Sequence, residues 1–162
     1  MISQTAEYAL RAALYLAARQ DRNPASAREI AEVTQVPVGY LQKILRMMAR
    51  AGIVTARRGV GGGFVLAKVP SAISVLDVLV ASDNGIQRIE RCPLGIKGHT
   101  RLCTMHRLLD TELARTEQVF ASTTLGDLLD GEGGVRPMFE PDECNSLPVE
   151  LGVRVHDEKS GQ

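Results

Sequence analysis

One stretch of the chain decides the fold: SAREIAEVTQVPVGYLQKILRMMARAGIVTARRGVGGGFVL, residues 26–66. It opens with Ser26-Ala27-Arg28-Glu29, a capping box in which the Ser26 hydroxyl accepts a hydrogen bond from a free helix amide while Glu29 reaches back. A short helix with an apolar face follows, and Thr34-Gln35-Val36-Pro37 ends it. Pro37 suits the start of a second helix because its fixed φ is already helical. The pattern predicts two helices joined by a tight turn.

The second helix is predicted to bury one face and to present long polar side chains on the others. Four apolar residues recur at helical spacing and form one stripe: Leu41, Ile44, Leu45 and Met48. The remaining faces carry long hydrogen-bond donors: Gln42, Lys43, Arg46 and Arg50. Gly52 is a natural end for this helix.

A glycine-rich hairpin is predicted directly after this helix. Residues 53–56 (IVTA) and 64–66 (FVL) are short apolar strands, and residues 59–63 (GVGGG) form the turn between them. The basic pair Arg57-Arg58 stands at the base of the turn. A hairpin after a helix-turn-helix makes a winged helix, a fold that holds one helix in a DNA groove. The predicted fold class is mainly α with a small β-wing.

Helices are predicted on both sides of this unit. A first helix at residues 5–19 supports it from behind with an alanine-rich face: Ala6, Ala9, Leu10, Ala13, Leu14 and Ala17. A helix follows at residues 73–80, and a short helix with a threonine cap covers residues 123–129. Between them a long helix runs to about Phe120 with one apolar face: Leu108, Leu109, Leu113 and Phe120.

The long helix is predicted to mediate dimerisation. A one-sided helix at the end of a small domain leaves its apolar stripe exposed in a monomer, and a two-fold partner would bury that stripe. A dimer of winged helices also matches a palindromic operator that is read in successive major grooves. We therefore expect three regions: a winged helix-turn-helix at 1–68, a linker helix, cysteine loop and dimerisation helix at 69–130, and an acidic, disordered tail at 131–162.

The distribution of charge favours DNA as a partner. The net charge of the chain is zero, but residues 1–68 hold 10 Lys and Arg against 4 Asp and Glu, and the remainder is correspondingly acidic. A basic surface binds phosphates and releases their counterions. The chain has no apolar run near the ~20 residues of a membrane helix, and its start lacks the features of a secretory signal. We expect a cytoplasmic protein, whose three cysteines are free thiols or metal ligands.

Three parts of the sequence resemble the IscR/NsrR-like regulators of the Rrf-two family. They are the wing at residues 53–67, Glu7-Tyr8-Ala9-Leu10-Arg11 near the start, and residues 123–128 (TTLGDL) after the long helix. The resemblance covers about residues 1–130. It implies a dimeric bacterial transcription factor that often senses iron–sulfur status, nitric oxide or redox state through a cluster.

The resemblance also implies DNA-contacting residues in the second helix of the helix-turn-helix and in the wing. They are Gly39, Tyr40, Gln42, Lys43, Arg46 and Arg58. Gln42 and Lys43 have the reach for base edges in the major groove, while an arginine on a glycine wing fits a narrow minor groove. Tyr40 has an equally good interpretation as a residue that packs against the domain.

A cysteine loop before the long helix is the candidate metal site. Cluster-binding relatives have three cysteines about six residues apart; here Cys92 and Cys103 match the first and third, and residues 97–99 (KGH) stand in place of the second. The resemblance implies His106 as a ligand and Glu7, from the partner subunit, as another, with His99 as a substitute. Iron in a [2Fe–2S] cluster accepts thiolate and histidine ligands. Cys144 and His156 lie in the tail, beyond the resemblance.

Other interpretations remain open at this point. Cys92 and Cys103 are ordinary thiols or a redox pair if the protein is a cluster-free repressor that responds to thiol oxidation, a small ligand or a protein partner. Two Cys and two His also suit tetrahedral zinc. Another alternative is a protein-interaction winged helix whose basic face binds an acidic protein instead of DNA. An enzyme is not expected, because the sequence pairs no nucleophile with a base, and Gly61-Gly62-Gly63 opens a strand instead of a nucleotide-binding helix.

Overall fold

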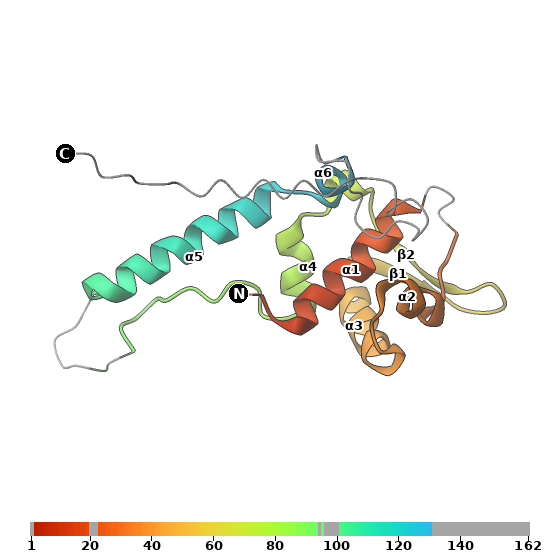
Figure 1. The fold of residues 1–162 in the computed structure, drawn as a ribbon, viewed down its shortest axis with the longest axis horizontal. Coiled ribbons are helices and arrows are strands. Elements are labelled where there is room, and N and C mark those ends of the chain that lie inside the picture. The colour runs from red at the N-terminus through yellow and green to blue at the C-terminus, as the bar shows by residue number, and fades with distance from the viewer. Residues whose placement is uncertain (1, 20–22, 94, 96–100, 131–162) are drawn as a thin grey trace, which may run out of the picture.

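The structure is a computed structural model that describes residues 2–19, 23–93, 95 and 101–130. Its elements in chain order are α1 (Gln4–Ala18), α2 (Ala27–Thr34), α3 (Val38–Arg50), β1 (Val54–Arg57), β2 (Gly63–Leu66), the 3-10 turn η1 (Pro70–Ala72), α4 (Val75–Ser82), α5 (Thr104–Ser122) and α6 (Leu125–Leu129). The first helices and the hairpin form one body, from which α5 extends (Figure 1). The predicted tail, with Cys144 and His156, lies outside the described residues.

The helix-turn-helix forms around a core of large aliphatic side chains. Ile30 on α2 and Leu41, Ile44, Leu45 and Met48 on α3 are at most 1% exposed, as the spacing predicts. Between the helices Gln35 adopts a left-handed conformation at φ 54°, and the Val36 amide donates to the Ala31 carbonyl at 3.2 Å. These contacts close the tight turn that the sequence predicts.

The predicted Ser26 cap forms at the start of α2, and Glu29 has partners outside its own helix. Ser26 Oγ accepts from the Glu29 amide at 3.1 Å. The Glu29 carboxylate, however, accepts from the Tyr15 hydroxyl at 2.9 Å and pairs with Arg19, both on or beside α1. The acid therefore fastens α2 to α1.

α1 buries a broader face than the predicted stripe. Ala12 and Leu16 are buried beside Ala6, Ala9 and Ala13, while the predicted Leu10, Leu14 and Ala17 lie half-buried at the margin. The reason is that α1 contacts several elements on different sides: α2, α3, α4, α6 and β2. Small alanine side chains let those elements approach the helix closely.

The wing is an antiparallel hairpin with an added bridge to the segment before α2. β1 and β2 pair from Val54 opposite Leu66 to Arg57 opposite Gly63. Ala25 pairs with Phe64 on the outer side of β2, with N–H···O distances of 2.8 and 3.0 Å. A side chain at Gly63 would place its Cβ 2.4 Å from the Ala25 carbonyl oxygen, so only glycine permits this approach.

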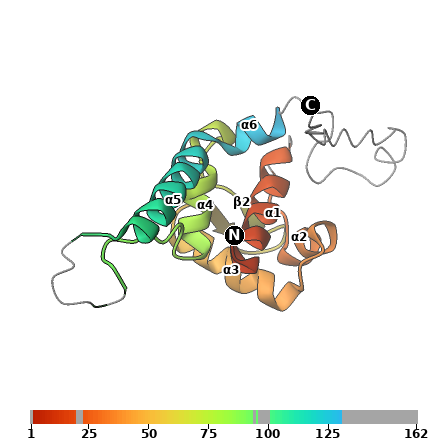
Figure 2. The same cartoon turned by 60° about the vertical axis from the view of Figure 1, so that its left-hand side comes forward.

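The start of α4 and the start of α6 are joined, and together they anchor the far end of α5. Ser74 and Thr124 each form a capping box with the aspartate three residues on, Asp77 and Asp127. Ser74 and Thr124 also form a backbone bridge, in which the Leu125 amide donates to the Ile73 carbonyl at 2.9 Å. α6 thereby lies against α1, while α5 runs beside α4 (Figure 2).

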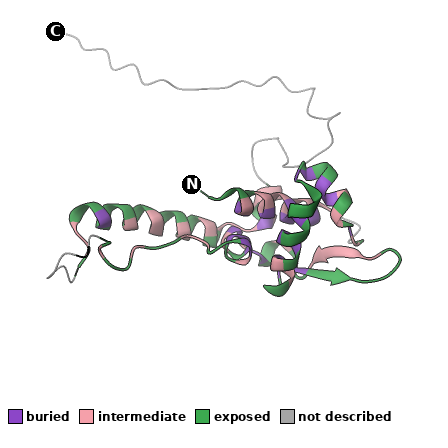
Figure 3. Ribbon diagram, turned by 90° about the horizontal axis from the view of Figure 1, so that it is seen from below, coloured by how far each residue is buried: buried purple, intermediate pink, exposed green. Residues whose placement is uncertain are grey.

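The long helix is present, and the exposure of its predicted apolar residues changes along its length. Phe120 packs against Ala6, Val75 and Leu79, and Leu113 is half-buried. Leu108 and Leu109 are 62% and 48% exposed, on a face that they share with Met105. Leu109, Leu113 and Phe120 lie on one side of the helix because they follow one another by four and seven residues, while Leu108 is turned by about 100° from Leu109. Phe120 is covered because this end of α5 contacts α4. Figure 3 shows how little of α5 is buried within one chain.

Candidate nucleic-acid interface and metal centre

α3 presents its long polar side chains away from the core. Gln42, Lys43 and Arg46 are exposed, and they alternate with the buried stripe of the same helix. Gly39, in the first turn, is also exposed. A helix of this kind, with one face fixed in a core and donors on the other, has the geometry of a recognition helix.

Tyr40 both packs on the domain and remains accessible. Its hydroxyl lies 2.6 Å from Thr5 Oγ1, and its ring meets the Tyr8 ring edge to face at a centroid distance of 5.9 Å. The side chain is still 40% exposed. The contacts with α1 agree with the packing interpretation and leave one side of the ring at the surface.

The wing turn brings Arg58 to the surface next to glycines. Arg57, Arg58 and Val60 are all exposed. A Cβ on Gly62 would lie 2.4 Å from the Arg57 carbonyl oxygen, so the turn needs glycine there. The result is a thin projection with a basic residue, a shape that fits a groove of DNA.

Three of the predicted metal ligands converge at the start of α5. Cys103 is the N-cap of α5, His106 lies in its first turn, and Cys92 comes from the segment after α4. His106 Nδ1 lies 3.2 Å from Cys103 Sγ and 3.6 Å from Cys92 Sγ. All three ligand atoms lie within 4.8 Å of one another, and His106 is only 8% exposed.

The donor set and its spacing fit a metal centre. Zn–S and Zn–N bonds of about 2.3 and 2.0 Å in a tetrahedron place sulfur and nitrogen ~3.5 Å apart, close to the separations here. Iron in a cluster takes the same two donor types. The backbone amide of His106 lowers the pKa of the Cys103 thiol, and the Cys92 side chain lowers it further against the effect of burial. A lowered thiol pKa favours the thiolate, the form that binds metal.

Glu7 does not join this group within one chain. It lies on α1, where its carboxylate pairs with Arg11. Arg11 in turn lies 3.4 Å from the Thr34 carbonyl at the end of α2. The role of Glu7 as a ligand from the partner subunit stays a prediction, and His99 lies outside the described residues.

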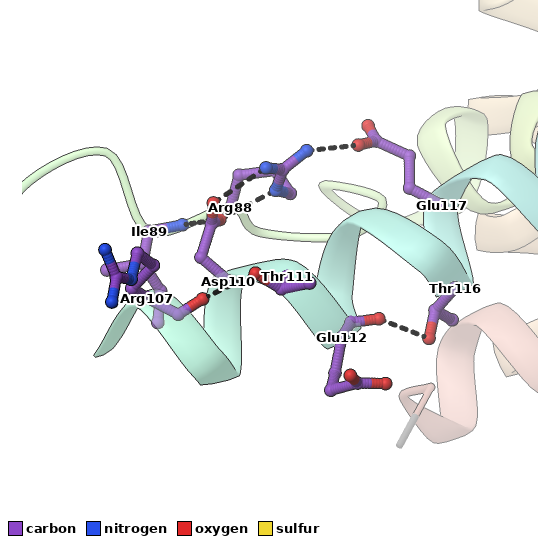
Figure 4. A network of polar contacts seen from close by, with 8 residues as sticks. All are labelled: Arg88, Ile89, Arg107, Asp110, Thr111, Glu112, Thr116 and Glu117. Carbon is purple, nitrogen blue, oxygen red and sulfur yellow. Dashed lines mark hydrogen bonds and ion pairs between the residues drawn. The ribbon is translucent and has the colours of Figure 1, made fainter. Parts of the chain in front are cut away.

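A polar network that the sequence did not predict lies between α5 and the segment that leads to Cys92. Arg88 binds Asp110 through two hydrogen bonds of 2.7 Å and reaches Glu117 at 3.2 Å. The Ile89 amide donates to the same Asp110 carboxylate at 3.0 Å (Figure 4). These hydrogen bonds hold the pKa of Asp110 down to about 2 and raise the pKa of Arg88. One sequence feature points to Asp110: it follows His106 by one helical turn and therefore lies on the same face of the helix.

The fold and the exposed basic helix define a winged-helix transcriptional regulator. Residues 2–131 match the model of the Rrf2 family, described as an iron-dependent transcriptional regulator. The chain belongs to this family, whose members are regulators and not enzymes. The expected family and fold class are thereby confirmed.

Relatives named as transcriptional regulators support the same class. An HTH-type transcriptional regulator of Synechocystis is 41% identical over 86 residues, which cover 53% of this chain and 58% of that relative's length. IscR of Vibrio cholerae is 30% identical over 161 residues, covering 98% of this chain and 90% of IscR. NsrR of Shouchella clausii is 25% identical over 141 residues, covering 83% and 91%.

Solved structures share the arrangement of the helices. CymR, the global cysteine regulator of B. subtilis, superimposes with a TM-score of 0.70 at 26% identity, covering 82% of this chain and 98% of CymR. IscR of T. potens gives a TM-score of 0.66 at 24% identity, covering 82% and 93%. In the described part of the chain, no helix has the length and hydropathy to cross a membrane.

Proposed function

We propose that this regulator is a homodimer that senses redox, nitric oxide or iron–sulfur status through a [2Fe–2S] cluster next to its dimer helix. Cys92, Cys103 and His106 would hold the cluster, with Glu7 of the partner subunit as the fourth ligand. The observation that carries the proposal is the convergence of the three ligand atoms within 4.8 Å at the start of α5. When bound, such a cluster supplies reversible one-electron and ligand-exchange chemistry.

The exposed face of α5 supports the dimer. Leu108 and Leu109, with Met105, offer apolar surface on a helix that leaves the body of the protomer (Figure 3). Burying this surface against the same helix of a second copy gives a two-fold interface. The two α3 helices would then read the half-sites of a palindromic operator, with Arg58 of each wing in the adjacent minor groove.

A change at the metal site has a direct route to the DNA-binding face. If Glu7 becomes a ligand, it leaves Arg11, the residue that contacts the end of α2 through the Thr34 carbonyl. The chain continues from there through Gln35 into α3. Occupation of the site then shifts the balance between arrangements of the two recognition helices that fit or do not fit both half-sites.

A second candidate function is thiol sensing without a cluster. It is favoured by the closeness of the Cys92 and Cys103 sulfurs, both free, and by the similarity to CymR, the cysteine regulator. In that case a hydroperoxide takes two electrons and two protons from the thiols and leaves as an alcohol and water, the two sulfurs join in a disulfide, and operator affinity responds to the thiol state. A colourless protein that binds its operator equally well at all iron supplies would support it.

Anaerobic purification followed by visible absorption and by iron and sulfide assays separates the two. The cluster proposal predicts a coloured protein with iron and sulfide in equal amounts, and loss of both in Cys92→Ala and in Cys103→Ala. A control variant, Arg107→Gln, changes an exposed residue next to His106 and should keep the colour. A colourless wild-type protein, after reconstitution under reducing conditions, would reject the cluster and leave thiol sensing.

A further inference from the structure

One face of α5 carries the metal ligands and the acids of the Arg88 network in a single row. The row begins at the N-cap and repeats with alternating steps of three and four residues: Cys103, His106, Asp110, Leu113 and Glu117. Residues at this spacing lie above one another along a helix. The segment that leads from α4 to Cys92 therefore runs along the same face that carries Cys103 and His106.

This segment is fastened to α5 by very few polar contacts. Among the described residues between α4 and residue 93, those that hydrogen-bond to α5 are Arg88, Ile89 and Cys92. Arg88 and Ile89 both use the carboxylate of Asp110, which takes three hydrogen bonds of 2.7, 2.7 and 3.0 Å. Figure 4 shows the guanidinium and the Ile89 amide on this one acid, with Glu117 on the other side of Arg88.

We propose that Arg88 and Asp110 are positioning residues that hold Cys92 against His106 and Cys103, so that the three ligands are assembled before metal binds. The role in metal binding rests on the proposed function, but the placement of Cys92 beside His106 and Cys103 is a property of the metal-free protein. Asp110 lies one turn after His106, and Arg88 lies four residues before Cys92. The Arg88–Asp110 contact, called the clamp below, and the contact of Cys92 with His106 therefore join the same two parts of the chain, the segment before residue 93 and the first turns of α5.

The contact has the features of a specific clamp. The two parallel N–H···O bonds form the bidentate arginine–carboxylate geometry, which fixes orientation as well as distance. The Asp110 side chain is only 19% exposed. Its third bond comes from the backbone amide of Ile89 and fixes the main chain three residues before Cys92. By contrast, the Glu112–Arg115 pair on the same helix is a single contact between exposed side chains.

Loss of the clamp should free Cys92 while leaving Cys103 and His106 in place. The last two lie on the rigid first turn of α5, but Cys92 lies on a segment without regular secondary structure. Pre-ordered ligands bind metal more tightly because the ordering cost has been met during folding. Removing a residue that orients a ligand costs about 10–100-fold in metal affinity.

The test compares Asp110→Asn and Arg88→Gln with the matched control Glu112→Gln in the full chain. The first readout is the affinity of the metal-free, reduced protein for Co²⁺, followed by thiolate-to-metal absorption. We expect Asp110→Asn to weaken Co²⁺ binding about tenfold, and Arg88→Gln to act similarly. The double variant should be no weaker than Asp110→Asn, because the two residues act through one contact. Arg88→Lys should restore only part of the affinity, since lysine lacks the bidentate fork.

The second readout needs no metal. In glutathione buffer, each Cys92–Cys103 disulfide that forms reduces one glutathione disulfide to two thiols, so the equilibrium reports how well the sulfurs are held together. We expect Asp110→Asn to lower this equilibrium constant roughly fivefold, with circular dichroism and Glu112→Gln unchanged. Equal values for Asp110→Asn and wild type in both readouts would overturn the clamp. Absence of Co²⁺ and cluster binding in the wild type would instead reject the proposed function, and the disulfide equilibrium would still decide the clamp.

Discussion

The winged helix and the segment around α5 are held together by different forces. In the winged helix, α2, α3 and the strands close over fully buried side chains such as Ile30, Leu41 and Leu45. In α5 the one buried residue is His106, and the preceding segment is attached through charged and sulfur-bearing side chains. The first region therefore keeps α3 and the wing in a fixed arrangement. The second depends on contacts that protons, oxidants and metals alter.

The largest effect should come from the core of the first region. Leu45→Ala removes a side chain with no exposed surface, and we expect the free energy of unfolding to fall by about 2–5 kcal/mol. Urea unfolding followed by circular dichroism measures it. Val33→Ala, at a position that is 47% exposed, should change stability by no more than about 0.5 kcal/mol. Similar losses in the two variants would mean that the core is not where the structure places it.

The second largest effect should come from removing charges on the proposed DNA-binding face of α3 and the wing. If Lys43 or Arg58 contacts a base, we expect its substitution by Ala to weaken operator binding by about 1–3 kcal/mol. If it contacts a phosphate, we expect the slope of log affinity against log salt concentration to fall by about one. Fluorescence anisotropy with an operator duplex at several salt concentrations measures both. Arg115→Ala, an exposed arginine on α5, is the matched control. If all three variants bind like wild type, α3 and the wing do not form the interface.

A substitution at Cys103 should separate stability from metal binding. Cys103 is the N-cap of α5, where the helix has no side-chain capping hydrogen bond, and serine is a preferred N-cap residue. We expect Cys103→Ser to raise the free energy of unfolding of the metal-free protein by about 0.5–1 kcal/mol and to abolish metal uptake. Cys103→Ala should also lose metal binding, but without an increase in the free energy of unfolding. Thermal unfolding and metal titration give the two results, and a destabilised Cys103→Ser would contradict the capping geometry.

The smallest effect should appear in acid. The pKa of Asp110 is lowered from 3.8 to about 2 by its hydrogen bonds from Arg88 and Ile89. Its contribution to stability is therefore complete above pH 3.8 and is lost as the pH falls toward 2. We expect the urea midpoint of the wild type to fall more steeply between pH 4 and pH 2 than that of Asp110→Asn. Parallel curves for the two proteins would show that the pair contributes nothing in solution.

The winged helix was predictable because its signals are local. The Ser26 cap, the Leu41–Met48 spacing and the glycine turn each act over a few residues, and each appears where the sequence puts it. The pair Cys103 and His106 was also local, since three residues separate them on one helix. The likeness to the IscR/NsrR-like regulators supplied all three candidate ligands, and no spacing rule connects Cys92 to His106.

The features that escaped prediction depend on the tertiary structure. Arg88 and Asp110 are 22 residues apart and meet only because the chain turns back along α5. Phe120 packs against α4 while Leu108 stays exposed, a difference that follows from where α5 contacts α4 and that periodicity alone does not reveal. Ala25 joins the wing through backbone atoms, which leave no mark on the residue type.

The most direct test of the account is operator affinity as a function of metal-site occupation. Wild-type protein is loaded anaerobically, divided, and stripped in one portion, and both portions are titrated against the same duplex; Cys92→Ala is treated in parallel. We expect a difference in affinity of about tenfold or more between the loaded and stripped wild type, and no difference for Cys92→Ala. Equal operator affinity for loaded and stripped wild type would contradict the claim that Cys92, Cys103 and His106 form a sensor.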